Sequence, residues 1–257
     1  MASTERTRLS AALEKRLAHV LAANRRHRDP VAEPRNRSPW LKPLQRWQAE
    51  RLAKSFADFV ASEATRPGAE FFLTDLYGDH DVTARDRGVE RVMPMMKKLM
   101  PPELLATAAD AIELAVLSHA FDLRVAEALD DMHIDPRQPL RTEDYAEAYR
   151  RAGKPHLRGH QVDLVVAIGN ALDQAVRKPW LSRLLRISRF PARAAGLGDL
   201  QSFLERGFAA FHAMADAPAF MEAIALRERE ASARLFAHDP DPFRISHPQA
   251  NSRSRTR

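Results

Sequence analysis

Apolar residues recur every three or four positions along almost the whole chain, and no segment alternates apolar and polar residues as a half-buried strand does. This spacing predicts a first helix that ends in the basic run 25–28 and has apolar positions at Leu9, Leu13, Leu17 and Val20. Four prolines lie between residues 29 and 43. They predict a linker after the first helix.

Further helices follow from the same spacing. The second begins near Trp40 and is expected to stop at Pro67-Gly68, and a short third helix covers 70–77. The fourth begins at Thr83, and Pro94 should kink it. The longest covers about 102–131. The remaining predicted helices are one capped by Thr142, one that runs from Pro155 to about Arg177, one in the basic segment 177–193, and two that cover 199–215 and 219–236. The pattern predicts an all-α single domain of eight to ten helices around the long central one.

The 257 residues suit one large domain, and the absence of cysteine excludes disulfide and thiolate chemistry. We expect three parts: an N-terminal helix with a basic, proline-containing linker (1–38), an all-helical domain (39–236), and a disordered basic tail (237–257). No stretch approaches the roughly 20 apolar residues of a membrane span, and the start lacks a secretory apolar segment. These features predict a cytoplasmic location.

The net charge of +6 is unevenly distributed. Residues 47–176 carry a net charge of −7, whereas 177–193 contain six basic residues and no acidic one. The remaining excess lies in the N-terminal 46 residues. A nucleic-acid binder favours a continuous basic face, so this distribution argues against nucleic acid as the partner.

The stretch 71–86, FFLTDLYGDHDVTARD, resembles the signature of an uncharacterised bacterial all-helical family, a domain of unknown function. Two further stretches resemble the same family: Glu113 with Leu117-Ser118 and Asp122, and the segment 200–208 near the C-terminus. The resemblance implies a helical bacterial protein. It supplies no activity, cofactor or catalytic residue.

The predicted long helix holds the first candidate site. Asp122 lies outside the helix's polar stripe, close to Ser118 and His119, and Glu113 lies within that stripe. A carboxylate in an apolar arc must be hydrogen-bonded, paired or protonated. The cluster is either a buried ligand or acid/base pocket or a set of polar cross-links between packed helices, and we favour the cross-links. In that case Asp122→Asn should lower thermal stability without changing any bound species.

The predicted loop after the third helix holds a second candidate site. Charged residues on a loop between two helices could bind a ligand, or could cap and pair the helix ends, and we favour capping and pairing. The residues of this motif turn are Asp75, Tyr77, Gly78, Asp81, Arg85 and Asp86.

Histidines suggest two weaker sites. The i, i+4, i+7 spacing of His156, His160 and Asp163 could bind a divalent metal, but it lies far from the helix's apolar centre and fits a solvated face better. His119 or His212 could ligate a haem in a bundle of this size. A lone histidine on an apolar face is more often a hydrogen-bonded core residue, and we expect no cofactor.

The segment 177–193 is basic and amphipathic. Such a segment can lie on an anionic membrane or dock an acidic partner. Its apolar residues Trp180, Leu181, Leu184 and Leu185 would equally serve as core contacts, and its arginines could pair with the acidic middle of the same chain. We favour that intramolecular interpretation.

No phosphate-binding glycine loop and no nucleophile-elbow motif is present in the sequence. The leading hypothesis is a non-enzymatic helical protein that works through a binding surface or small pocket, with a protein partner or a second copy of the chain. One alternative is a metal- or haem-dependent enzyme that uses a buried His/Asp cluster. Another is a binder of nucleic acid or an acidic partner through the basic segments.

Overall fold

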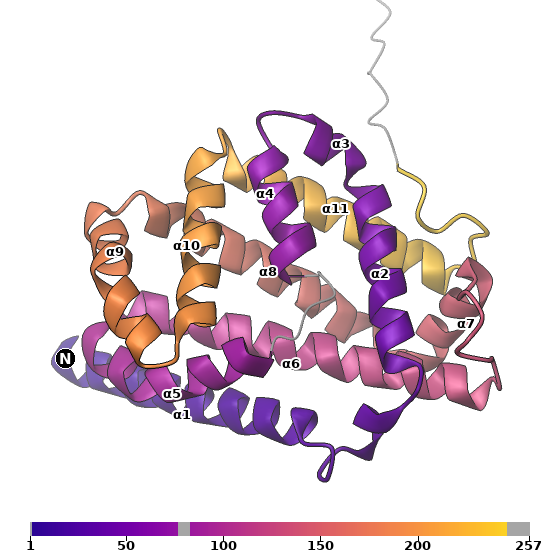
Figure 1. Ribbon diagram of the computed structural model, residues 1–257, viewed down its shortest axis with the longest axis horizontal. Coiled ribbons are helices and arrows are strands. Elements are labelled where there is room, and N and C mark those ends of the chain that lie inside the picture. The colour runs from indigo at the N-terminus through magenta and orange to yellow at the C-terminus, as the bar shows by residue number, and fades with distance from the viewer. Residues whose placement is uncertain (1, 77–82, 246–257) are drawn as a thin grey trace, which may run out of the picture.

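The computed structural model describes residues 2–76 and 83–245, without the side chains of 2–10, 83–87, 98 and 99. The described chain contains eleven α-helices and no strand (Figure 1). They are α1 (Ala2–Arg28), α2 (Leu41–Ser55), α3 (Ala57–Ala61), α4 (Arg66–Phe71), α5 (Thr83–Leu99), α6 (Pro102–Asp131), α7 (Thr142–Ala152), α8 (Pro155–Val176), α9 (Pro179–Ala194), α10 (Gly198–Ala213) and α11 (Ala217–Phe236). A 3-10 turn, η1 (Pro34–Arg37), and a π-helical turn, η2 (Phe72–Leu76), complete the described elements. The prediction of an all-α fold is confirmed.

The 30-residue helix α6 lies in the middle of the bundle. Helix α1 runs along one side of it, α8 along another, and α7 packs beside its C-terminal half (Figure 1). By length and hydropathy α6 is the one helix in the described chain that could cross a membrane. About 28% of its apolar window is buried, and the helix packs against α1, α7 and α8. The predicted limits of 102 and 131 are those observed.

Three groups of buried residues form the core. The largest joins α2, α3, α4, α8, α10 and α11 and contains a run of edge-to-face phenylalanine pairs. A second surrounds Trp40 at the C-terminal end of α6. The third joins α1 to α5 and α6 through Leu17, Val20, Met93 and Ile112. The domain boundary at residue 38 stays a prediction, but the third group places core contacts on both sides of it.

Three predicted helix limits differ from the structure. The expected second helix is divided at Phe56 into α2 and α3, which brings the number of helices above ten. Pro67-Gly68 does not stop a helix but lies in the first turn of α4. Proline is tolerated there because the first N–H groups of a helix have no intrahelical acceptor. Thr142 is the first residue of α7 rather than its cap, and Arg141 precedes it in extended conformation.

The start of the expected C-terminal tail packs on the domain. Pro242 is fully buried, and the ring of Phe243 lies 5.9 Å from Trp47 and 6.0 Å from Tyr145 between centroids. The guanidinium of Arg51 lies 5.0 Å from the centroid of the Phe243 ring. The described part of the tail up to Ile245 is therefore part of the fold.

Candidate functional site

The four candidate residues of α6 contact different residues of four neighbouring elements. Successive helical residues turn by about 100°, so positions 118, 119 and 122 lie within about 100° of one another around the helix, and position 113 lies on the opposite side. Each polar group meets a partner from another element: α1 and α8 for Glu113, α8 for Ser118, η1 for His119 and α2 for Asp122. The described residues therefore form cross-links between helices rather than one shared pocket.

Glu113 joins three helices. One carboxylate oxygen lies 2.5 Å from Nη2 of Arg16 on α1, and the other lies 2.8 Å from Nε2 of His160 on α8. Arg16 also pairs with Asp110 at 2.7 Å. Burial opposes ionisation of Glu113, but the hydrogen bonds from His160 and Arg16 outweigh it and hold the pKa of this carboxyl below its usual value. The group is thus an anionic link between α1, α6 and α8.

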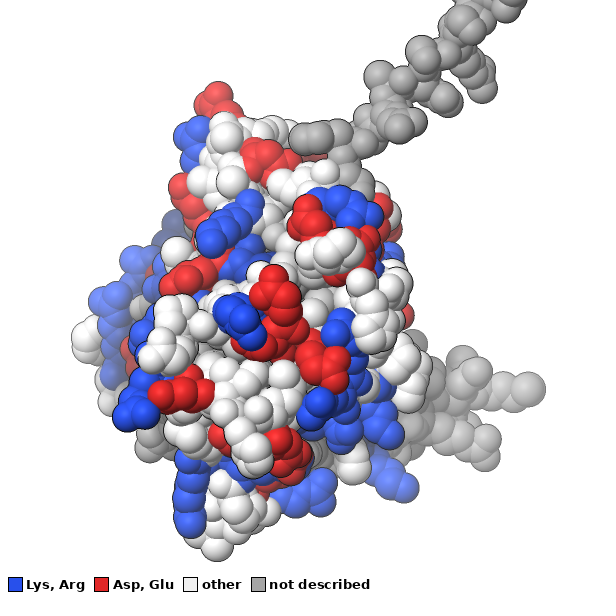
Figure 2. Space-filling view, turned by 90° about the vertical axis from the view of Figure 1, so that its right-hand side faces the viewer, with Lys and Arg blue, Asp and Glu red and all other residues white. Residues whose placement is uncertain are grey.

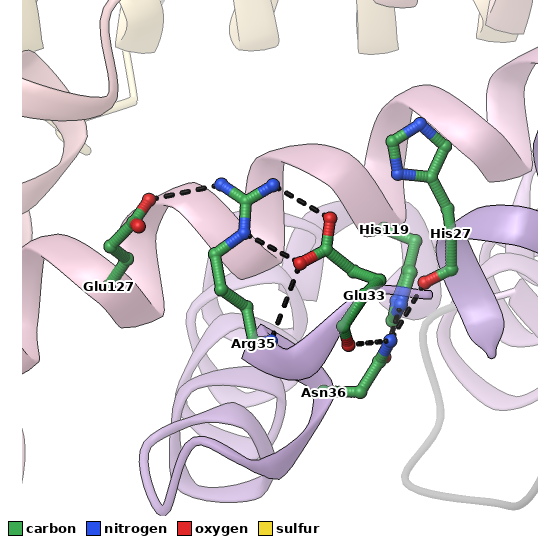
Figure 3. A network of polar contacts seen from close by, with 6 residues as sticks. All are labelled: His27, Glu33, Arg35, Asn36, His119 and Glu127. Carbon is green, nitrogen blue, oxygen red and sulfur yellow. Dashed lines mark hydrogen bonds and ion pairs between the residues drawn. The ribbon is translucent and has the colours of Figure 1, made fainter. Parts of the chain in front are cut away.

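His119 is buried, with 7% of its surface exposed. Its Nε2 lies 2.8 Å from Oδ1 of Asn36, whose amide nitrogen donates to the backbone oxygens of His27 and Glu33 (Figure 3). Because that nitrogen is committed to two carbonyls, Oδ1 accepts and Nε2 of His119 carries the proton. Burial, with the nearby positive charge of Arg28, lowers the pKa of His119 to about 4. The imidazole is neutral at pH 7.

Beside His119, Glu33 and Arg35 hold η1 against α6. Nε and Nη2 of Arg35 each lie 2.8 Å from a carboxylate oxygen of Glu33, and Nη1 lies 3.0 Å from Glu127 on α6 (Figure 3). The hydrogen bonds from Arg35 lower the pKa of Glu33 to about 2. This bidentate pair fixes the proline-rich turn that presents Asn36 to His119.

Asp122 faces α2. Nε2 of Gln45 donates to its carboxylate at 3.1 Å. Burial raises the pKa of this carboxyl, although Gln45, Gln48 and the charge of Arg158 act in the opposite direction. Ser118, one turn earlier, accepts a hydrogen bond from Nε2 of Gln161 at 2.8 Å. The expected neighbours Ser118, His119 and Asp122 thus have separate partners.

Arg158 on α8 is a buried residue that the sequence analysis missed. Only 8% of its surface is exposed, and its guanidinium carbon lies 3.6 Å from the centroid of Phe121 and 4.2 Å from that of Tyr149. Its Nε and Nη2 have no hydrogen-bond partner among the described residues. Arg158 precedes Val162 by four residues and Val165 by seven, so the three side chains lie on the same, inward-facing side of α8. Stacking between two rings accounts for a buried arginine without a close counter-charge.

The proposed metal ligands of α8 do not converge. His160 pairs with Glu113, Asp163 lies 2.7 Å from Nη2 of Arg229, and His156 is exposed. No group of three or more potential metal ligands occurs in 2–76 and 83–245. His212, the alternative haem ligand, is exposed on α10. The two histidine-based site predictions therefore receive no support from the geometry.

Part of the motif turn connects η2 to α10. Asp75 is buried, and Nε of Arg206 donates to its carboxylate at 2.7 Å. One turn earlier, the Phe71 ring stacks near Phe203, with centroids 5.5 Å apart, and lies against Gly207. Residues 71–75 and 203–207 belong to two of the stretches that carry the family resemblance. The structure joins them into one packing unit, which favours a structural role for this part of the motif.

The rest of the motif turn is outside the described residues. Tyr77, Gly78 and Asp81 fall in the undescribed segment 77–82, and the side chains of Arg85 and Asp86 on α5 are likewise not described.

Helix α9 covers the basic segment and is only partly packed. Leu181 is buried against the domain, and Leu185 is half-buried. Four large apolar side chains remain exposed: Trp180 at 44%, Leu184 at 41%, Ile187 at 65% and Phe190 at 82%. The interpretation of Trp180 and Leu184 as core contacts is therefore wrong, whereas that of Leu181 holds.

The arginines of α9 pair with the chain only in part. Arg189 lies 2.8 Å from Glu205 on α10, and Arg177, just before α9, lies 2.9 Å from Asp173. Arg183 and Arg186 have no ion pair with any described residue. Only the pair with Asp173 involves the acidic middle of the chain.

A depression in the described surface with a volume of about 440 Å³ lies at the opposite end of the molecule from α9. It is open to solvent and lined by residues of α2, α7 and 240–245, among them Trp47, Arg51 and Phe243. Figure 2 shows this end of the molecule with Lys, Arg, Asp and Glu interspersed. No single-sign patch marks it as a site for a charged ligand.

The model of a protein family described as "Domain of unknown function (DUF8198)" matches residues 23–242. The chain therefore belongs to this family of helical proteins of unknown function, as the resemblance predicted. Its bacterial origin and the signature motif stay predictions. No curated protein and no solved structure matches the chain.

Proposed function

We propose that this chain is a cytoplasmic, non-enzymatic binding protein and that α9 is its docking face for a negatively charged partner. One observation carries the proposal: four large apolar side chains are exposed on α9 beside two arginines that have no counter-charge among the described residues. Exposed apolar patches of this kind mark interaction surfaces in soluble domains. The unpaired arginines set the sign of the partner's charge.

The polar residues of α6 support the non-enzymatic part of the proposal. Acid/base or nucleophilic catalysis needs groups that converge on one reacting atom. Glu113, Ser118, His119 and Asp122 instead each bond to a different residue: His160 and Gln161 on α8, Asn36 on η1 and Gln45 on α2. Their arrangement is that of cross-links that hold α6 in the bundle.

Site-specific photocrosslinking in cells that make the full chain tests the docking face. A photoreactive phenylalanine analogue replaces Ile187 on α9, and in a matched control it replaces Leu226 on α11, which is 58% exposed. We expect an adduct from position 187 that is absent from position 226 and is reduced by Arg183→Gln with Arg186→Gln. An adduct with a protein counts only if purified components reproduce the interaction. No adduct at 187, equal adducts at both positions, or adducts only between copies of the chain would overturn the proposal.

A further inference from the structure

The exposed apolar residues of α9 form a continuous stripe. Trp180, Leu184, Ile187 and Pro191 are spaced by four, three and four residues, so they lie within about 60° of one another around the helix. Phe190, the most exposed of the large apolar residues on α9, lies next to the stripe. The helix has 16 residues and is therefore about 24 Å long. The stripe runs along most of that length.

Helix α9 lies at the periphery of the molecule, with α10 next to it on the side of the centre (Figure 1). Two depressions of the described surface are lined by residues of α2 and of segments C-terminal to α10, and α9 lines neither of them. The exposed stripe therefore lies outside both depressions.

Positive charge lies on one side of the stripe. Arg183 and Arg186 are on the solvent-facing flank, and neither is paired within the described chain. Residues 177–193 contain six basic residues and no acidic one. Trp, Leu and Ile lie on one face, and two arginines with Phe190 between them lie on the next. Such an arrangement fits a helix that lies in the interface of an anionic bilayer.

We infer that this face of α9 binds an anionic phospholipid membrane surface, an inference that rests on the proposed docking role of α9. A second copy of the chain fits less well, because two copies of α9 face to face would bring their arginines together. An acidic protein is the remaining alternative, and the crosslinking experiment at position 187 distinguishes it from a membrane. A bilayer supplies both the apolar layer and the negative headgroups at the required depth.

Helix α9 can lie on a membrane without leaving the domain. Nε2 of Gln201 on α10 donates to the backbone oxygen of Leu185 at 2.7 Å, and Arg189 pairs with Glu205. These contacts and the buried Leu181 hold the side of α9 that faces the domain. The stripe is on a different side. The bilayer would therefore contact the folded protein along one edge, with Trp180 near the headgroups.

Co-sedimentation of the purified full chain with vesicles tests the inference. One set of vesicles is phosphatidylcholine alone, and the other contains equal amounts of phosphatidylcholine and phosphatidylglycerol. We expect binding to the second set, loss of that binding at high salt, and a blue shift of tryptophan emission. Trp40 is fully buried, and Trp47 is half-buried in the depression lined by α2, α7 and 240–245, away from α9. Trp180 is therefore the tryptophan positioned to give the shift, and Trp180→Phe should remove it while binding persists.

Two pairs of variants separate the apolar and charged contributions. Ile187→Ser with Phe190→Ser should abolish binding, whereas Leu226→Ser, at an exposed apolar position on α11, should leave it unchanged. Arg183→Gln and Arg186→Gln should each weaken binding about five-fold. Lys42→Gln and Lys54→Gln, at exposed positions of α2, are the charge controls and should have little effect.

The vesicle and crosslinking experiments test the membrane inference and the proposed docking role of α9 separately. If the chain does not bind the phosphatidylglycerol vesicles, or if the control variants weaken binding as much as the α9 variants, the membrane inference is overturned. In that case a crosslink from position 187 to an acidic protein, reproduced with purified components, would still support α9 as a docking face. Failure of both experiments would remove the docking face itself.

Discussion

Oδ1 of Asn36 lies 2.8 Å from Nε2 of His119 and accepts a hydrogen bond from it, so a residue of the proline-rich linker fixes the tautomer of a buried histidine in the central helix. The linker therefore contributes directly to the interior of the domain. The same amide donates to the backbone oxygen of His27, so the end of α1, η1 and α6 are held together by one side chain (Figure 3).

Acidification should destabilise the protein through His119. Its pKa in the folded state is about 4, below the usual 6.5, so between these values the unfolded chain binds a proton that the folded protein does not. The free energy of unfolding is therefore highest above pH 6.5 and should fall by about 3 kcal/mol as the pH drops to 4. Urea unfolding at several pH values measures this slope.

His119→Gln is the matched variant, because its side-chain amide can still donate to Asn36 but does not titrate. It should flatten the slope, with a residual part from His27, whose pKa is also lowered, by burial and by Arg26. His156→Gln, at an exposed position, should keep the full slope. Equal slopes for the natural protein and His119→Gln would contradict the assignment.

Asp122→Asn should raise stability at neutral pH. The pKa of Asp122 is raised in the folded state, so the contribution of this carboxyl is largest below the unfolded value of 3.8 and is lost as the pH rises through the folded value. An amide avoids that loss and can still bond to Gln45. Thermal unfolding of both proteins across pH measures the difference, which should vanish in acid. Lower stability of the variant at pH 7 would show that the ionised form is favoured in the fold.

Gly207→Ala should destabilise the packing of η2 and α4 on α10. An added Cβ would lie 2.9 Å from Cζ of Phe71, closer than side-chain carbons approach in folded proteins. We expect a loss of about 1 to 3 kcal/mol in the free energy of unfolding. Phe71→Leu in the same chain should recover part of it. If the losses of the two single variants simply add in the double variant, the close contact is not their cause.

Arg206→Ala removes a donor from the buried carboxylate of Asp75 and should lower the free energy of unfolding by about 1 kcal/mol. Arg229→Ala is the control, because its ion pair with Asp163 is exposed on both sides and should contribute less than about 0.5 kcal/mol. Chemical denaturation compares the two. A larger effect at the exposed pair would refute a special role for Asp75.

The helices could be predicted because their limits depend on local features. Both ends of α6 follow from an opening proline pair and the end of its apolar spacing. The prediction that Pro67-Gly68 ends a helix was wrong for a physical reason. Proline interrupts the interior of a helix but is tolerated in its first turn, and the residue type alone does not show which of these positions it occupies. The sequence also gave no indication of the break at Phe56.

The site was harder to predict, because partners come from distant parts of the chain. Periodicity identified Asp122 as a polar residue in an apolar arc, but Gln45 is 77 positions away and Asn36 is 83 positions from His119. The sign expected for Asp122→Asn also changed, since it depends on the pKa of the carboxyl in its actual surroundings. For α9, the sequence predicted an amphipathic helix, but which apolar side chains remain exposed to solvent depends on how the helix packs in the fold.

The packing of α1 on α5 and α6 limits how far the protein can be shortened from its N-terminal end. The family match begins at residue 23, but Leu17 and Val20 lie before it and are buried against Met93, Leu105 and Ile112. Arg16, which pairs with Glu113, is lost with them. A fragment trimmed to the limits of the family match would expose an apolar strip of α6 to water, and aggregation of such a fragment would reflect the choice of boundary rather than an unstable domain.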